Sequence, residues 1–128
     1  MEAFEALVAE ALDQLPASIR QRMENVALVV EEWPQPARLA ALGYDPDRDL
    51  LGLYEGIPRP QRGSGYHLAV PDRITIFRQP ILDQVGSGGR AAIVREVRNT
   101  VIHEVAHHFG IDDEALARLE GGDPFPAP

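Results

Sequence analysis

The stretch R-A-A-I-V-R-E-V-R-N-T-V-I-H-E-V-A-H-H-F-G-I-D-D-E, residues 90–114, decides how the rest of the chain can fold. Its apolar residues recur at the spacing of an α-helix and would form one buried side of that helix. They are Val94, Val97, Val101, Ile102, Val105 and Phe109. Polar side chains at positions 96, 100, 103, 104 and 107 form a separate stripe. This pattern predicts a core helix that carries a polar site along its margin.

The polar stripe contains the pattern H-E-x-x-H at residues 103–107. Residues four apart lie one above the other on a helix, so the imidazoles of His103 and His107 can bind one metal ion. Glu104 is rotated by about 100° around the helix from His103, which points its carboxylate beside the ion. A general base that acts on an activated water is needed there. We therefore expect His103 and His107 to be metal ligands and Glu104 to be catalytic.

A third ligand must come from outside this pattern, because a catalytic zinc ion usually has three protein ligands. Gly110 can adopt the left-handed backbone conformation that ends a helix and turns the chain. Asp112, Asp113 and Glu114 follow it and compete for the role. We prefer Asp113 because its spacing after Gly110 matches the third-ligand position of the extended motif. Asp112 is better placed to cap a following helix.

The complete pattern, V-I-H-E-V-A-H-H-F-G-I-D-D at 101–113, resembles the zincin metallopeptidases, and specifically a small bacterial zincin-like family. The stretches L-L-G-L-Y-E-G at 50–56 and P-D-R-I-T-I-F-R-Q-P-I-L at 71–82 are also similar to that family, so the resemblance covers most of the chain. It implies a minimal zincin-like fold and a zinc-dependent peptidase. It also implies that an edge strand beside the metal-binding helix pairs with an extended peptide substrate. Residues 50–55 are the candidate strand.

The composition is that of a single globular domain, and we expect residues 1–128 to form it. The net charge is −8 and there is no basic cluster, which disfavours nucleic acid and anionic membrane surfaces as partners. The chain has no cysteine, so disulfides and thiolate zinc ligands are excluded. The partner that we expect is a peptide or protein substrate.

The N-terminal sequence predicts a cytoplasmic protein, and the C-terminal sequence predicts a flexible tail. The N-terminus, M-E-A-F-E-A-L-V-A-E, is acidic and lacks the basic region and long apolar run of a signal peptide. No run reaches the roughly 18 apolar residues that a membrane-spanning helix needs. Residues 121–128 are rich in glycine and proline, and we expect this tail to be flexible.

Hydrophobic periodicity and turn residues predict an α+β fold, with a small sheet of about three strands packed on an N-terminal helix and the metal-binding helix. The strand at 26–31 is nearly continuous in apolar residues, so we expect it to be buried on both faces. Gly52 indicates a bulge or a close backbone approach, and Pro80 should close the third strand. The other expected elements are strands at 50–55 and 73–78, with Ile74, Ile76 and Phe77 inward, and helical segments at 2–15, 16–24, 36–43, 81–85 and 113–120.

The leading functional hypothesis is a zinc-dependent peptidase, with the metal held by His103, His107 and Asp113 and with Glu104 as the general base. A different class also fits, namely a non-catalytic binding module that keeps the zincin scaffold and a structural or vestigial metal. A metal-dependent hydrolase of a non-peptide amide is a third candidate. The segment at 56–72 is long for a connection, which favours a functional role, and its Tyr66 or His67 could polarise the substrate.

Overall fold

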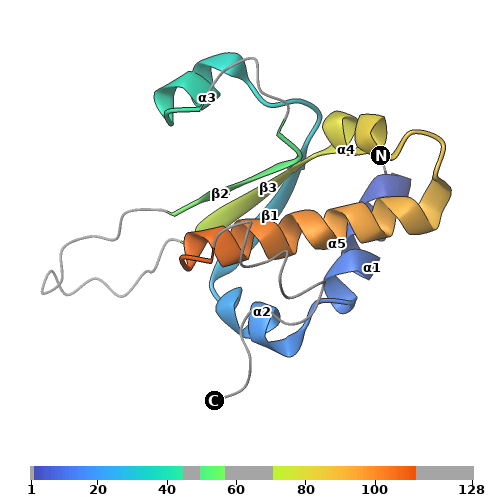
Figure 1. Ribbon diagram of the computed structural model, residues 1–128, viewed down its shortest axis with the longest axis horizontal. Helices are drawn as coiled ribbons and strands as arrows, with labels where there is room; N and C mark the ends of the chain where they lie inside the picture. The colour runs from blue at the N-terminus through green and yellow to red at the C-terminus, as the bar shows by residue number, and fades with distance from the viewer. Residues whose placement is uncertain (1, 45–49, 57–70, 112–128) are drawn as a thin grey trace, which may run out of the picture.

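The computed structural model describes residues 2–44, 50–56 and 71–111 (Figure 1). These residues form helices and a three-stranded sheet, which confirms the predicted α+β class. The elements are α1 (Glu2–Asp13), α2 (Ala17–Arg22), β1 (Val26–Glu31), α3 (Pro36–Ala41), β2 (Gly52–Glu55), β3 (Asp72–Phe77), α4 (Arg78–Val85) and α5 (Gly89–His108). Among them, no helix is long and apolar enough to cross a membrane.

The sheet has the order β1-β3-β2, with β3 in the middle. β1 runs parallel to β3, and β2 runs antiparallel to it. α5 extends along one side of the sheet, while α3 lies on the other side (Figure 1). In the described part of the chain β2 is thus an edge strand, and α5 packs directly against it.

β2 presents alternate backbone groups to its outer edge. The N–H of Phe77 donates to the carbonyl of Leu51 at 2.9 Å. Because antiparallel pairs alternate between bonded and non-bonded positions, Leu53 also bonds towards β3. The N–H and C=O groups of Gly52 and Tyr54 then point away from β3. These outward groups face the part of α5 that carries the polar stripe.

The main core lies between the sheet and helices α1 and α5. Ile74 and Ile76 of β3 are fully buried in it, as expected. The predicted apolar side of α5 is also buried, except for one residue: Phe109 is 47% exposed. That expectation was wrong: the Phe109 N–H still donates to the Val105 carbonyl at 3.1 Å, but Val105 is the last α5 residue in the main core, and the Phe109 ring lies against Arg22.

A smaller core covers the opposite face of the sheet. Phe77 is buried there with Leu39 of α3, Leu50 and Leu53. Phe77 is therefore inward, but on the other face from Ile76, because neighbouring strand residues point to opposite faces. β3 is consequently the strand that is buried on both faces.

Two expectations about the strands were wrong. β1 is half-buried along its whole length and not buried on both faces, since it pairs only with β3 in the described sheet. Pro80 does not close β3, because the strand ends at Phe77 and α4 begins at the next residue. Pro80 is tolerated in the first turn of α4, where a backbone N–H has no helical partner. The predicted helix at 113–120, the tail and residues 57–70 lie outside the described residues.

Candidate functional site

The C-terminal end of α5 has the geometry predicted for Gly110. Gly110 has φ +91°, and its N–H donates to the carbonyl of His107 at 3.0 Å. The N–H of Ile111 donates to the carbonyl of Ala106 at 2.8 Å. These two bonds form a Schellman motif, which ends the helix and turns the chain. The turn comes immediately before the acidic residues 112–114.

His103 and His107 lie together on the exposed side of α5. Their rings meet edge to face, with centres 5.9 Å apart. Two imidazoles that bind one zinc ion at about 2.1 Å in a tetrahedral shell have ring centres roughly 5 Å apart. Small side-chain rotations would therefore bring both rings onto a common ion. The spacing fits the metal that the sequence predicts.

The hydrogen bonding of His103 also fits a metal ligand. Its Nδ1 lies 3.0 Å from the carbonyl oxygen of Asn99. A carbonyl oxygen can only accept, so Nδ1 is the donor in this hydrogen bond. Histidines that bind metals commonly donate their other ring nitrogen to a backbone carbonyl in this way.

The third predicted ligand, Asp113, lies outside the described residues, so its position stays a prediction. Within residues 2–44, 50–56 and 71–111, no three histidine or carboxylate side chains come together as a metal site. A third protein ligand would have to come from residues outside these ranges, and Asp113 stays the predicted one.

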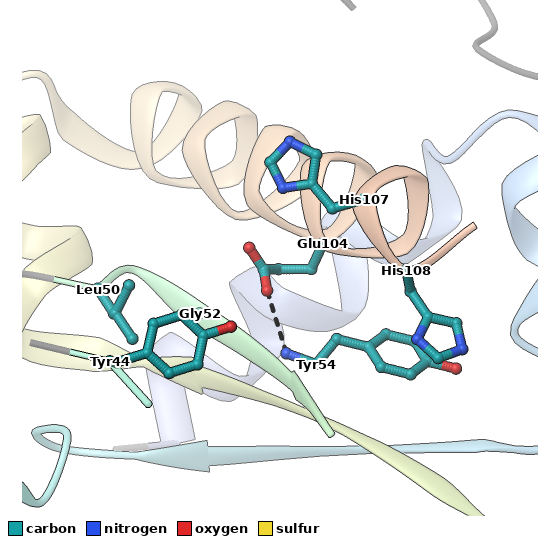
Figure 2. Close-up of a pocket in the computed structure, with 7 residues that line it drawn as sticks. All are labelled: Tyr44, Leu50, Gly52, Tyr54, Glu104, His107 and His108. Atoms are coloured by element: carbon teal, nitrogen blue, oxygen red, sulfur yellow. Dashed lines mark hydrogen bonds between the residues drawn. The ribbon is translucent and has the colours of Figure 1, made fainter. Parts of the chain in front are cut away.

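Glu104 points from α5 to the edge of β2. One of its carboxylate oxygens accepts a hydrogen bond from the main-chain N–H of Tyr54 at 3.1 Å (Figure 2). The side chain is half-buried between the helix and the strand. His107 projects from a different side of α5 (Figure 2). The position of Glu104 on the helix thus aims its carboxylate at β2.

A cavity of about 470 Å³ opens between α5 and β2. Figure 2 shows Glu104 above the middle of β2, with Tyr44 and Leu50 towards one end and Tyr54 and His108 towards the other. The full lining is Tyr44, Leu50, Gly52, Tyr54, Glu104, His107 and His108. The proposed base and one proposed ligand therefore share a cavity with the edge strand.

Tyr54, Asp72 and His108 form a polar cluster that the sequence did not reveal. The Tyr54 hydroxyl donates to an Asp72 carboxylate oxygen at 2.7 Å. The His108 ring stacks on the Tyr54 ring, with centres 4.0 Å apart and planes at 18°. Tyr66 and His67, the residues singled out on the neighbouring segment, lie outside the described residues.

The close approach expected at Gly52 is present. A Cβ atom at this position would lie 2.7 Å from the Thr100 side-chain methyl and 3.1 Å from the Thr75 carbonyl oxygen. Gly52 therefore lets α5 approach β2 closely enough for Glu104 to reach the strand. Thr100 is fixed in turn, because its hydroxyl donates to the carbonyl of Glu96 at 2.8 Å.

A cluster of ion pairs joins β2 to α3 and to the other two strands. Glu55 accepts hydrogen bonds from Arg38 of α3 and from Arg73 of β3. Arg38 also pairs with Glu31 of β1 at 3.1 Å. Burial acts to raise the pKa of Glu55, but the two guanidinium groups hold that pKa below its ordinary value. The cluster links α3 and all three strands next to Tyr54.

Comparisons with known proteins bear on the family and the fold of this chain. The sequence profile of the family described as zincin-like metallopeptidase matches residues 23–123. A solved structure of a conserved hypothetical protein from Thermo thermophilus is similar to this chain, with a TM-score of 0.55 and 24% identity over 91% of this chain and 96% of that one. At that identity the likeness shows the fold alone. No protein of curated function matches. The profile covers far more than half of the sequence, and the chain belongs to the zincin-like metallopeptidase family.

Proposed function

We propose that the protein is a zinc-dependent peptidase. His103, His107 and Asp113 would hold the metal, and Glu104 is the general base. A peptide or protein is the substrate. When bound, zinc supplies a Lewis acid that polarises the scissile carbonyl and lowers the pKa of water.

The observation that supports the proposal most is the shared cavity. Glu104 and His107 line it from α5, and Gly52 and Tyr54 line it from β2. A base, a candidate metal ligand and outward-facing strand amides are the groups that an extended peptide must meet together. A binding module has no need of a carboxylate that shares a cavity with one of the two histidines.

Glu104 performs the proton transfers in this proposal. Its carboxylate accepts a proton from the attacking water, whose oxygen forms a bond to the scissile carbon. The same carboxyl then gives that proton to the amine nitrogen as the C–N bond breaks. Glu104 is already directed at the cavity by its hydrogen bond to Tyr54.

The outer edge of β2 is the proposed substrate track. The outward N–H and C=O of Gly52 offer one donor and one acceptor to a peptide strand, next to the Tyr54 N–H, which already donates to Glu104. The ring of Tyr44 and the side chain of Leu50 line the cavity towards one end of this track. An apolar or aromatic side chain of the substrate fits that end best.

The test is cleavage of an unfolded-protein or peptide library by the zinc-loaded full chain. Glu104→Gln should keep the zinc content and lower kcat by about 10²–10⁴-fold, the usual contribution of a general base. Glu96→Gln is a matched control, because it removes one carboxylate from the same helix two turns earlier. Wild-type protein that carries zinc and cleaves no member of the library would overturn the proposal.

Melting with and without a chelator separates the peptidase from the binding module. Zinc that binds only the native state raises the free energy of unfolding by about 4 kcal/mol when its concentration is 1,000 times Kd. Both functions predict this shift. Only the peptidase adds a cleavage activity that Glu104→Gln removes.

A further inference from the structure

We propose that Tyr54 is the positioning residue for Glu104. Its main-chain N–H fixes the carboxylate at the edge of β2, and its side chain is anchored so that this N–H keeps its place. The inference rests on the proposed function, in which Glu104 is the general base. It adds a role for a strand residue that the H-E-x-x-H pattern does not contain.

A hydrogen bond joins the Tyr54 main chain to the Glu104 side chain. The Tyr54 N–H faces away from β3, and it donates to the Glu104 carboxylate at 3.1 Å. Hydrogen bonds to a charged acceptor are stronger and more directional than neutral ones. A glutamate side chain has several rotatable bonds, so one such bond removes much of its freedom. The position of the N–H thus determines where the carboxylate lies.

The Tyr54 side chain is held in place by Asp72 and His108. Its hydroxyl donates to Asp72, the first residue of β3, at 2.7 Å. Its ring stacks on His108, whose Nε2 lies 3.9 Å from the same Asp72 oxygen. Tyr54 is therefore held from β3 and from α5, the helix that carries Glu104. The strand and the helix cannot separate without breaking these contacts.

The buried carboxylate of Asp72 has a cost in folding free energy. The Asp72 side chain is only 17% exposed, and burying a carboxylate is unfavourable unless its oxygens are bonded. A purely structural contact at this point could be made by apolar side chains alone. Accurate placement of a base does require such bonds, because a displacement of about 1 Å can cost a factor of 100 in rate.

Kinetics of the zinc-loaded full chain test the role of the anchor. Tyr54→Phe removes the hydroxyl and keeps the ring. It should lower kcat on the order of tenfold and change KM by less than about twofold. Asp72→Ala should have the same effect, and the double variant should be no slower than either single variant. Asp72→Asn keeps an oxygen acceptor for the hydroxyl and should retain most of kcat.

Thr75→Val is the matched control, because it removes a buried hydroxyl from β3 outside the site. It should leave kcat unchanged, and circular dichroism should show that every variant is folded. Tyr54→Phe with kcat within about twofold of wild type would overturn the proposal, as would a loss confined to KM.

Hydrogen exchange of the Tyr54 amide tests the bond itself without any hydrolysis. Glu104→Ala should speed this exchange by about tenfold or more, whereas Glu104→Gln, which keeps an oxygen acceptor, should not. An exchange rate that is the same in Glu104→Ala and wild type would overturn the inference. Absence of peptide cleavage would remove the proposed function and leave the exchange result valid, so the two failures are distinguishable.

Discussion

Replacing Gly52 by alanine should push α5 away from β2. The new Cβ atom would lie 2.7 Å from the Thr100 Cγ2 and 3.1 Å from the Thr75 carbonyl oxygen. The first distance is too short for two carbon atoms and the second is tight, so the helix or the strand must move. Overpacking of this kind costs about 1–3 kcal/mol. The loss of unfolded-state freedom returns about 0.4–1 kcal/mol, which leaves a net destabilisation of about 1–2 kcal/mol.

A thermal melt, supported by urea unfolding, measures this effect. For a chain of this length, about 1–2 kcal/mol corresponds to a fall in Tm of roughly 3–10 °C. The displacement also separates Glu104 from the Tyr54 N–H, now 3.1 Å from its carboxylate. We therefore expect kcat to fall together with Tm.

A second substitution tests the mechanism directly. Thr100→Ser removes the Cγ2 methyl and keeps the hydroxyl that donates to the Glu96 carbonyl. In the Gly52→Ala background it should recover about half of the lost stability, because the tight contact with the Thr75 carbonyl oxygen and the ordinary one with the Ile76 side chain at 3.4 Å remain. In the wild-type background it should be neutral or slightly destabilising. A Gly52→Ala variant as stable as wild type would show that the close approach does not limit this position. The same effect of Thr100→Ser in both backgrounds would show that the Thr100 methyl is not the obstacle.

Three other substitutions probe the framework around the site. Thr75→Val should stabilise the protein by about 1 kcal/mol in urea unfolding, because the Thr75 hydroxyl is buried without a partner among the described residues; destabilisation would contradict this. Gly110→Ala should cost about 1 kcal/mol, since φ is +91° there; an unchanged Tm would argue against the left-handed cap. Glu55→Gln tests the ion pairs of Glu55, whose pKa in the folded state lies below its ordinary value of 4.5. These ion pairs therefore stabilise the protein above pH 4.5, and the stabilisation is lost as the pH falls through the folded-state pKa. The stability gap between wild type and Glu55→Gln should therefore narrow below pH 4.5, and a gap that widens on acidification would be inconsistent with the pairing.

The sequence predicted the metal-binding helix well because its signals are local. Apolar spacing defined the buried side of α5, and Gly110 marked its end. Gly52 likewise indicated a close approach that the structure contains. Each of these features depends on residues a few positions apart, or on the special freedom of glycine.

The features that were missed depend on contacts between distant segments. Tyr54 and Asp72 are 18 positions apart, and no spacing rule joins them. These two residues meet His108 because β2 pairs with β3 and the C-terminal end of α5 packs on β2. β1 was expected to be buried because it is apolar, but its place at the side of the sheet leaves it half-exposed. Phe109 fitted the helical period but follows the last helical residue.

The most direct test of the zinc site is an anomalous-scattering map from a crystal of the full chain grown with zinc. We expect one zinc peak at about 2.0–2.1 Å from a ring nitrogen of both His103 and His107, with an oxygen of Asp113 as the third protein ligand. A zinc peak that neither histidine coordinates, or histidine rings that share no metal ion, would contradict the proposed zinc site.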